Sequence, residues 1–262
     1  MKECKLFVYL LFFVPFITFA QTPKGIEKDL VKSFKRIDYW YGKQGDTTTD
    51  ILTAADSLAK ANDVFGKKLR YYTAKYPFTL HQTFGLLKKE YLGVLSSSDG
   101  LFRIYSWDRL TGGTMHFYEN VIQYKFQSKT NSILNVDTSG EGNYIYDYSN
   151  VYTLNVDDKT YYLAIYNGVF STRVMDKGVQ IFSIENGKLN NNTKIIKTTS
   201  GLRGRLYYEY DLGPIIDESI DDNIHYNVAL KTISIPVIDG DKVTKGRIKY
   251  KFTGKYFEKA KS

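Results

Sequence analysis

The chain has 262 residues, a net charge of +8 and a single cysteine. Because that cysteine is Cys4, everything after residue 20 is free of disulfides, thiol nucleophiles and cysteine-ligated metals. The moderate positive charge favours contact with anionic surfaces without demanding nucleic acid. We therefore expect no nucleic-acid partner.

The first twenty residues have the pattern of a secretory signal peptide. Lys2 and Lys5 precede an apolar run from Leu6 to Phe19, and Ala20 supplies a small residue before Gln21. The run is short for a membrane span, so cleavage after Ala20 is favoured over an uncleaved anchor. We expect an exported protein, periplasmic or extracellular, with no membrane span in the mature chain. Without disulfides, its hydrophobic core must stabilise it.

Two amphipathic stretches predict helices near the N-terminus. In the first, residues 26–41, apolar side chains recur at spacings of three and four. The second follows a helix cap at Thr49 or Asp50 and ends at Gly66 or runs on to Lys75. We expect a helical segment packed on the main domain.

The helical segment spans residues 21–77 and closes at Tyr76-Pro77, because a residue before proline avoids helical geometry. Residues 78–262 are rich in Tyr, Phe, Ile, Val and Thr and alternate with a period of two, which predicts strands. Five turn signals punctuate them: Asp99-Gly100, Gly112-Gly113, Asp157-Asp158, Asn186-Gly187 and Asp239-Gly240.

Four of these turns join strand-like runs into hairpins. The predicted pairs are YLGVLSS with LFRIYSWD, VYTLNV with KTYYLAIY, GVQIFSIE with KLNNNTKIIK, and KTISIPVI with DKVTKGRIKYKF. Pro236 indicates an edge strand or a bulge in the last pair. The fold class expected is mainly β: an antiparallel hairpin meander, arranged as a sandwich, barrel or partial propeller, preceded by N-terminal α-helices.

Two stretches, SSSDGLFRIYSWD and GVQIFSIENGKL, resemble hairpins of propeller blades. The chain as a whole resembles uncharacterised secreted proteins of Bacteroidota-type bacteria. The FAQ cleavage context, the IYSWD…TGGTM…VIQYK block and the GRIKYKFTGKYF ending carry this resemblance. It implies an exported compartment and a β architecture, and it implies no particular chemistry.

The stretch SWDRLTGGTMH contains residues suited to a small catalytic constellation. If Gly112-Gly113 forms a tight turn, Arg109 faces His116, and Asp108 lies on the opposite sheet face and cannot pair with the histidine. In a wider loop, Asp108 would cap the turn instead. We interpret the stretch as a structural hairpin and keep Trp107 and His116 as candidate ligand-binding residues.

The stretch NYIYDYS places Tyr144, Tyr146 and Tyr148 on one face of a strand. An exposed row of aromatic rings stacks on sugars. Tyrosine also suits strands that are half-buried, which is the structural alternative. We include all three tyrosines among the candidate ligand-binding residues.

No cofactor or metal is predicted. The three histidines, His81, His116 and His225, are far apart in the sequence and show no metal-ligand spacing. No nucleophile motif or nucleotide-binding loop occurs. The stretch DTSGEG resembles a calcium loop, but Tyr148 stands where the loop needs its bidentate acid.

Two charged stretches have both a functional and a structural interpretation. The acids of one loop bind calcium, act on a glycosidic bond or are simply solvated: Asp217, Glu218, Asp221 and Asp222. Four cations alternate with packing residues near the C-terminus: Lys245, Arg247, Lys249 and Lys251. They protect an outer strand from aggregation, or they contact an anionic partner such as lipopolysaccharide or an acidic glycan.

These patterns favour a non-enzymatic binding or structural module of the cell envelope, in contact with a glycan or an envelope protein. The alternative is a glycan-acting hydrolase that uses the loop carboxylates. A hydrolase requires two carboxyl groups that converge in a cleft, whereas a binding module requires exposed aromatic rings without such a pair. We assign no catalytic residue, and the sequence does not predict the oligomeric state.

Overall fold

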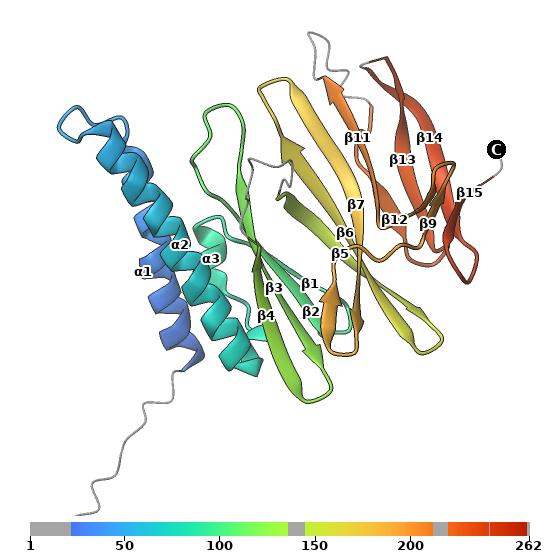
Figure 1. Cartoon of the computed structure of the whole chain (residues 1–262), viewed down its shortest axis with the longest axis horizontal. Helices are drawn as coiled ribbons and strands as arrows, with labels where there is room; N and C mark the ends of the chain where they lie inside the picture. Colours follow the sequence, from blue (N-terminus) through green and yellow to red (C-terminus); the bar gives the residue numbers. More distant parts are fainter. Residues whose placement is uncertain (1–21, 136–144, 212–219, 241, 261–262) are drawn as a thin grey trace, which may run out of the picture.

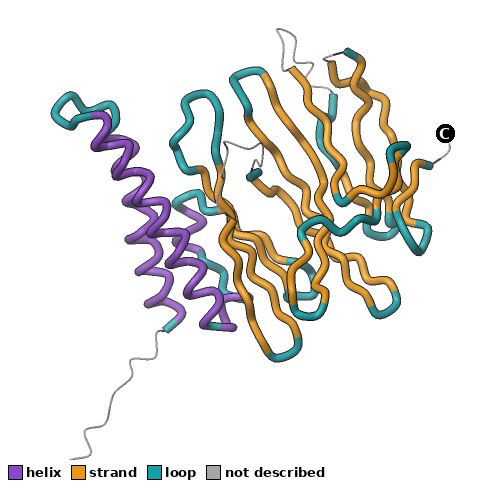
Figure 2. The backbone as a smooth tube through the Cα atoms, viewed as in Figure 1, coloured by secondary structure: helices purple, strands orange, loops and turns teal. Residues whose placement is uncertain are grey.

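The computed structural model describes residues 22–135, 145–211, 220–240 and 242–260. The protein is mainly β, with 46% of residues in strands and 25% in helices, and the helices precede the strands, as predicted. A helical pair and three β-sheets lie side by side as four layers (Figure 1; Figure 2). No helix in these ranges is long and apolar enough to cross a membrane.

The helical layer consists of α1 (Pro23–Lys43) and α2 (Ile51–Lys75), followed by the 3-10 turn η1 (Pro77–Leu80) and the short α3 (Gly85–Lys89). The predicted cap is confirmed, because the Asp50 carboxylate accepts a hydrogen bond from the Thr53 amide at 2.9 Å. α2 runs to Lys75 and stops before Pro77, as expected.

The first strands form sheet A in the order β1-β2-β3-β4: β1 (Gly93–Ser96), β2 (Phe102–Asp108), β3 (Tyr118–Phe126) and β4 (Lys129–Asn135). Sheet B has the order β11-β7-β6-β5, with β8 on β7: β5 (Asp147–Val156), β6 (Lys159–Val169), β7 (Val174–Glu185), β8 (Lys188–Asn190) and β11 (Arg205–Asp211).

Sheet C has the order β10-β9-β15-β14-β13-β12: β9 (Ile196–Thr198), β10 (Gly201–Arg203), β12 (His225–Asn227), β13 (Thr232–Asp239), β14 (Lys242–Phe252) and β15 (Phe257–Lys259). Its neighbours pair antiparallel except β15 with β9. Among the described residues none of the three sheets closes into a barrel.

Three predicted hairpins are confirmed, as β1–β2, β5–β6 and β13–β14. The fourth is confirmed only in part: β7 pairs with β8, but the next strand lies in sheet C. Pro236 stands at a register shift, which is the predicted bulge. The cationic strand β14 lies between β13 and β15, but β15 pairs only with residues 250–252. The predicted outer position is therefore confirmed in part, because residues 242–248 have β13 as their one described ladder partner.

Three hydrophobic clusters join the four layers. The helices cover sheet A through residues such as Leu58 and Phe65. Sheet A packs on sheet B, where the rings of Phe102 and Tyr162 stack with centroids 4.5 Å apart. Sheet B packs on sheet C through aliphatic residues such as Val179. Both faces of sheets A and B are therefore covered, and the outer face of sheet C is open to solvent.

Trp107 belongs to the contact between α2 and sheet A. Its side chain is buried, and its ring meets Phe65 edge to face at 5.0 Å. The indole N–H donates to Asn62 Oδ1 at 3.1 Å, and Asn62 Nδ2 donates to the carbonyls of Leu58 and Arg109 at 3.0 and 2.9 Å. The fully buried amide of Asn62 thus links the helix to the end of β2.

Replacing Asn62 by alanine should lower the free energy of unfolding by about 2–4 kcal/mol, because it leaves the indole N–H and two carbonyls without this partner. Urea unfolding measures the loss. Asp63→Ala, an exposed neighbour on the same helix, serves as the control and should change stability by less than about 0.5 kcal/mol. Equal effects of the two substitutions would contradict the assignment.

Candidate functional site

The predicted tyrosine row is buried where the structure describes it. Tyr146 and Tyr148 are each 7% exposed and pack between sheets A and B, while Tyr144 lies outside the described residues. The Tyr148 hydroxyl donates to Gln180 Oε1 at 2.8 Å. The expectation of an exposed stacking surface is therefore wrong for these two tyrosines, and Trp107 is equally inaccessible.

Close packing explains why these rings face inward. A Cβ added to Gly178 would lie 2.2 Å from the Tyr166 hydroxyl, so glycine alone leaves room for that ring. The Arg205 guanidinium lies over the rings of Tyr146 and Tyr166, 5.2 and 5.3 Å from their centroids. Burial raises the pKa of the adjacent Asp176 carboxyl to about 6, although the Tyr146 hydroxyl opposes this shift.

The SWDRLTGGTMH stretch forms a wide loop. Asp108 pairs with Tyr118 in the strand register, so residues 109–117 lie outside the ladder and the tight-turn interpretation is wrong. Asp108 caps the loop by accepting from the Leu110 amide at 2.8 Å, as the alternative predicted. Its other oxygen lies 2.5 Å from His116 Nδ1, so the aspartate and histidine do pair.

A second carboxyl group lies beside this pair. Burial and the charge of Asp108 raise the pKa of Asp147 to about 6. Burial, Asp147 and Asp108 raise the pKa of the Tyr118 hydroxyl. We call Asp108, His116, Tyr118 and Asp147 the rim cluster. It joins sheet A to sheet B, where the His116 amide also donates to the Val169 carbonyl at 3.0 Å.

The predicted loop acids are engaged in ion pairs where they are described. Asp217 and Glu218 lie outside the described residues. Asp222 Oδ2 lies 2.8 Å from Lys177 Nζ, and Asp221 Oδ2 lies 2.6 Å from His225 Nε2. Burial raises the pKa of both carboxyls, but hydrogen bonds and neighbouring cations outweigh it, so both pKa values are lowered.

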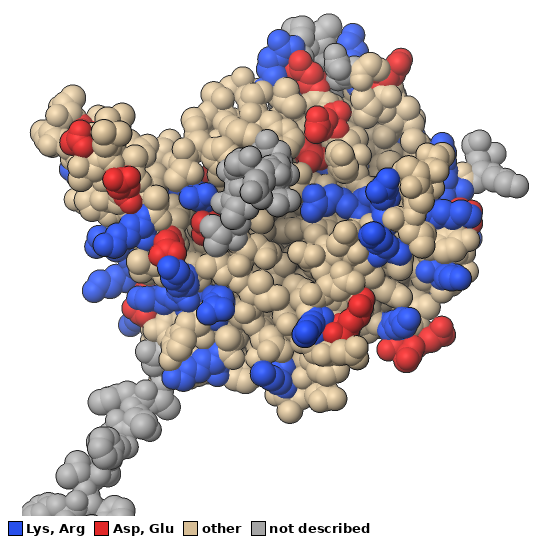
Figure 3. Space-filling model, viewed as in Figure 1, with Lys and Arg blue, Asp and Glu red and all other residues tan. Residues whose placement is uncertain are grey.

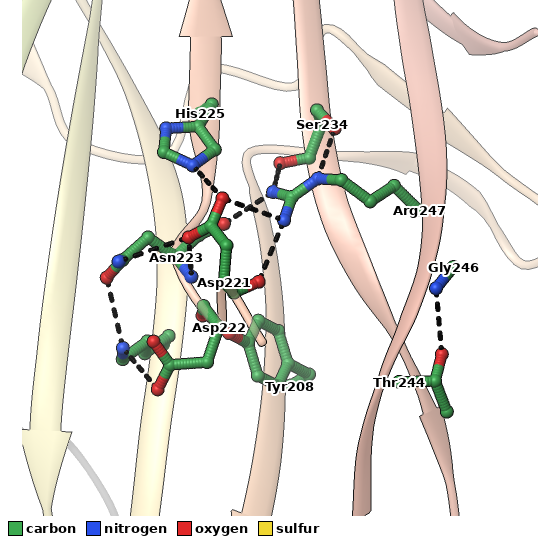
Figure 4. A network of polar contacts seen from close by, with 10 residues as sticks. Tyr208, Asp221, Asp222, Asn223, His225, Ser234, Thr244, Gly246 and Arg247 are labelled. Atoms are coloured by element: carbon green, nitrogen blue, oxygen red, sulfur yellow. Dashed lines mark hydrogen bonds and ion pairs between the residues drawn. The ribbon is translucent and has the colours of Figure 1, made fainter. Parts of the chain in front are cut away.

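Arg247 holds this segment against sheet C (Figure 4). Its side chain crosses β13, where Nε donates to Ser234 Oγ at 2.7 Å. One terminal nitrogen donates to the Asp221 carbonyl at 3.0 Å, and the other donates to the Asn223 carbonyl. One of the four predicted cations therefore has a structural role.

Beside Arg247, an open pocket of about 400 Å³ lies on the outer face of sheet C. We call it the sheet C pocket; its lining residues are His225, Asn227, Leu230, Thr232, Ser234, Lys249, Lys251 and Ala260. The short side chains of β13 lie in register between two taller walls. Lys249 and Lys251 form one wall, and the residues of β12 form the other.

Both lysines are available to a ligand. Lys249 and Lys251 are exposed, and in the described part of the chain neither has a carboxylate within 4.0 Å. The nearest acid in register, Glu258 opposite Lys251, pairs with Lys197 at 2.7 Å. Figure 3 shows Lys and Arg side chains around this end of the molecule and along the helical pair.

Comparison with protein-family models, curated proteins and solved structures gives no match. Within the described ranges, no group of three or more His, Cys, Asp or Glu side chains is placed to hold a metal ion. The lysines of the pocket were visible in the sequence. No sequence pattern predicted the other wall of the pocket, because β12 is short and His225 lies in no recognisable motif.

The raised pKa of Asp147 predicts a pH-dependent gain of stability in Asp147→Asn. The folded state disfavours the ionised carboxyl, so wild type carries a penalty above pH 6 that disappears below about pH 4. Two pKa units correspond to roughly 2–3 kcal/mol, so the melting temperature at pH 8 should rise by about 4–12 °C. Thermal unfolding at pH 4 and pH 8 checks this, and an equal shift at both values would contradict it.

Proposed function

We propose that this protein is an exported, non-enzymatic binding module of the cell envelope and that the sheet C pocket binds an anionic ligand. The observation that carries the proposal is a pair of exposed lysines without a carboxylate partner in the described chain. They line a pocket on the outer face of sheet C, which no other layer of the described residues covers. The signal-peptide pattern of residues 1–20 supports export.

The charge balance around the pocket supports an anionic ligand. Residues 220–260 contain eight basic and five acidic residues. Three of those acids already pair with Arg or Lys: Asp221 with Arg247, Asp222 with Lys177 and Glu258 with Lys197. The field at the pocket is therefore positive, and it attracts a negatively charged polymer or surface.

Replacing Lys249 and Lys251 together by glutamine should weaken binding of polygalacturonate by about tenfold or more, because each lysine loses its attraction to a carboxylate. Lys24→Gln with Lys28→Gln, an equal change on the exposed side of α1, is the matched control. Titration at 50 and 200 mM salt should show weaker binding at the higher salt, since the contacts are solvent-exposed.

An equal loss of affinity in both double variants would contradict a localised site. So would the absence of any binding to polygalacturonate at low salt.

The rim cluster supports a second candidate function, a glycan-acting hydrolase. A carboxyl group with a pKa of about 6 suits a general acid, and the Asp108 carboxylate holds the His116 imidazole in place as a base for water. In such a reaction, Asp147 protonates the leaving oxygen while His116 takes a proton from the attacking water. In this form of the hydrolase hypothesis, the acid and the base lie in the rim cluster instead of the 217–222 loop.

If the protein is a hydrolase, incubation with polygalacturonate releases reducing ends, and Asp147→Asn abolishes the release without weakening binding. Asp176→Asn, which neutralises another carboxyl with a raised pKa, is the control and should retain activity. Bound polymer without new reducing ends would leave only the binding function.

A further inference from the structure

The two walls of the sheet C pocket differ in chemistry. The β14 wall presents two ammonium groups, from Lys249 and Lys251. The opposite wall presents the amide of Asn227 and the imidazole of His225. His225 Nε2 pairs with Asp221 Oδ2 at 2.6 Å, so Nδ1 is the ring nitrogen that faces a ligand. Asn227 Oδ1 accepts from the Leu230 amide at 2.9 Å, which leaves the NH₂ group to donate to a ligand.

The spacing of the walls suits a ring rather than a bare ion. β12 and β14 flank β13, so the two walls rise from backbones about 10 Å apart. Along β14 the two lysines are separated by about 7 Å, the repeat of two strand residues. A small anion contacting the lysines would not reach Asn227 on the far wall.

The floor adds hydroxyl and apolar contacts. Thr232 and Ser234 are the outward residues of β13, and their hydroxyl groups line the pocket. Leu230, which is 63% exposed, supplies apolar surface at one end. A sugar ring presents a polar edge and an apolar face, so it uses both kinds of contact.

Arg247 bounds the other end of the pocket. Its side chain crosses β13 at Ser234 and is committed to Asp221 and Asn223 (Figure 4). Lys245 lies beyond this crossing in the β14 sequence, so the β14 cations are not one continuous track. The ligand facing Lys249 and Lys251 is therefore a short unit rather than a long polyanion aligned with the whole strand.

We propose that the sheet C pocket binds an acidic sugar unit of a glycan. Its carboxylate or sulfate faces Lys249 and Lys251, and its ring hydroxyls face His225 and Asn227. This inference rests on the proposed function and specifies its ligand.

Calorimetric titration with galacturonate oligomers of one to six units tests the proposal. Digalacturonate should bind about tenfold or more tightly than neutral digalactose or inorganic phosphate, because only it engages both walls. Extending the oligomer from two to six units should raise the affinity per site by less than about threefold, since the pocket holds a short unit.

The Asn227→Ser variant tests the contribution of the β12 wall to binding separately from that of the lysine wall. A serine hydroxyl still accepts from the Leu230 amide but cannot replace the NH₂ donor. The variant should weaken digalacturonate binding by about fivefold and leave phosphate binding unchanged, whereas the Lys249→Gln/Lys251→Gln pair weakens both. The melting temperature of each variant confirms that it is folded.

Three results would overturn the inference. They are phosphate binding as tight as digalacturonate, an Asn227→Ser variant with unchanged digalacturonate affinity, and a rise of about tenfold or more between two and six units. Each of these results would be consistent with the proposed anion-binding function but would show that the ligand is not a short acidic sugar unit. Failure of every anionic probe, polygalacturonate included, would remove the proposed function as well.

Discussion

The architecture depends on covering the apolar faces of its sheets. A sheet with an apolar face must bury that face against another layer. Sheet A is apolar on both sides and lies between the helices and sheet B, and sheet B lies between sheets A and C. The stack of layers ends at sheet C, because its last strands alternate apolar with charged residues. One face of sheet C therefore packs on sheet B, and the other faces solvent. The location of the candidate binding surface follows from this arrangement.

Local patterns predicted most of the elements. The Asp50 cap, the stop before Pro77 and three hairpins depend on backbone preferences that neighbouring residues reveal. The β3–β4 hairpin was missed because Gln127 adopts the left-handed conformation at its turn, with φ of 55°, where no glycine marks it. The parallel pairing of β15 with β9 joins segments about sixty residues apart, and no local signal encodes it.

The sequence predicted only part of each candidate site, because local patterns do not encode contacts between distant segments. Alternation correctly placed Tyr146 and Tyr148 on one face, but alternation cannot say whether that face meets solvent or another sheet. The Asp108–His116 pair depends on a nine-residue loop, residues 109–117. The glycine pair is compatible with both a tight turn and a wider loop, so it could not decide between them. Asp147 comes from sheet B and Asn227 from β12, so only the tertiary fold brings them to the rim cluster and the sheet C pocket.

We propose that this protein binds its ligand at the open face of sheet C. Amine-specific labelling of the protein, quantified by mass spectrometry with and without polygalacturonate, tests it most directly. Lys249 and Lys251 should lose reactivity when polymer is bound, while Lys24 and Lys28 on α1 remain unchanged. Protection confined to the helical lysines, or spread evenly over the chain, would contradict it.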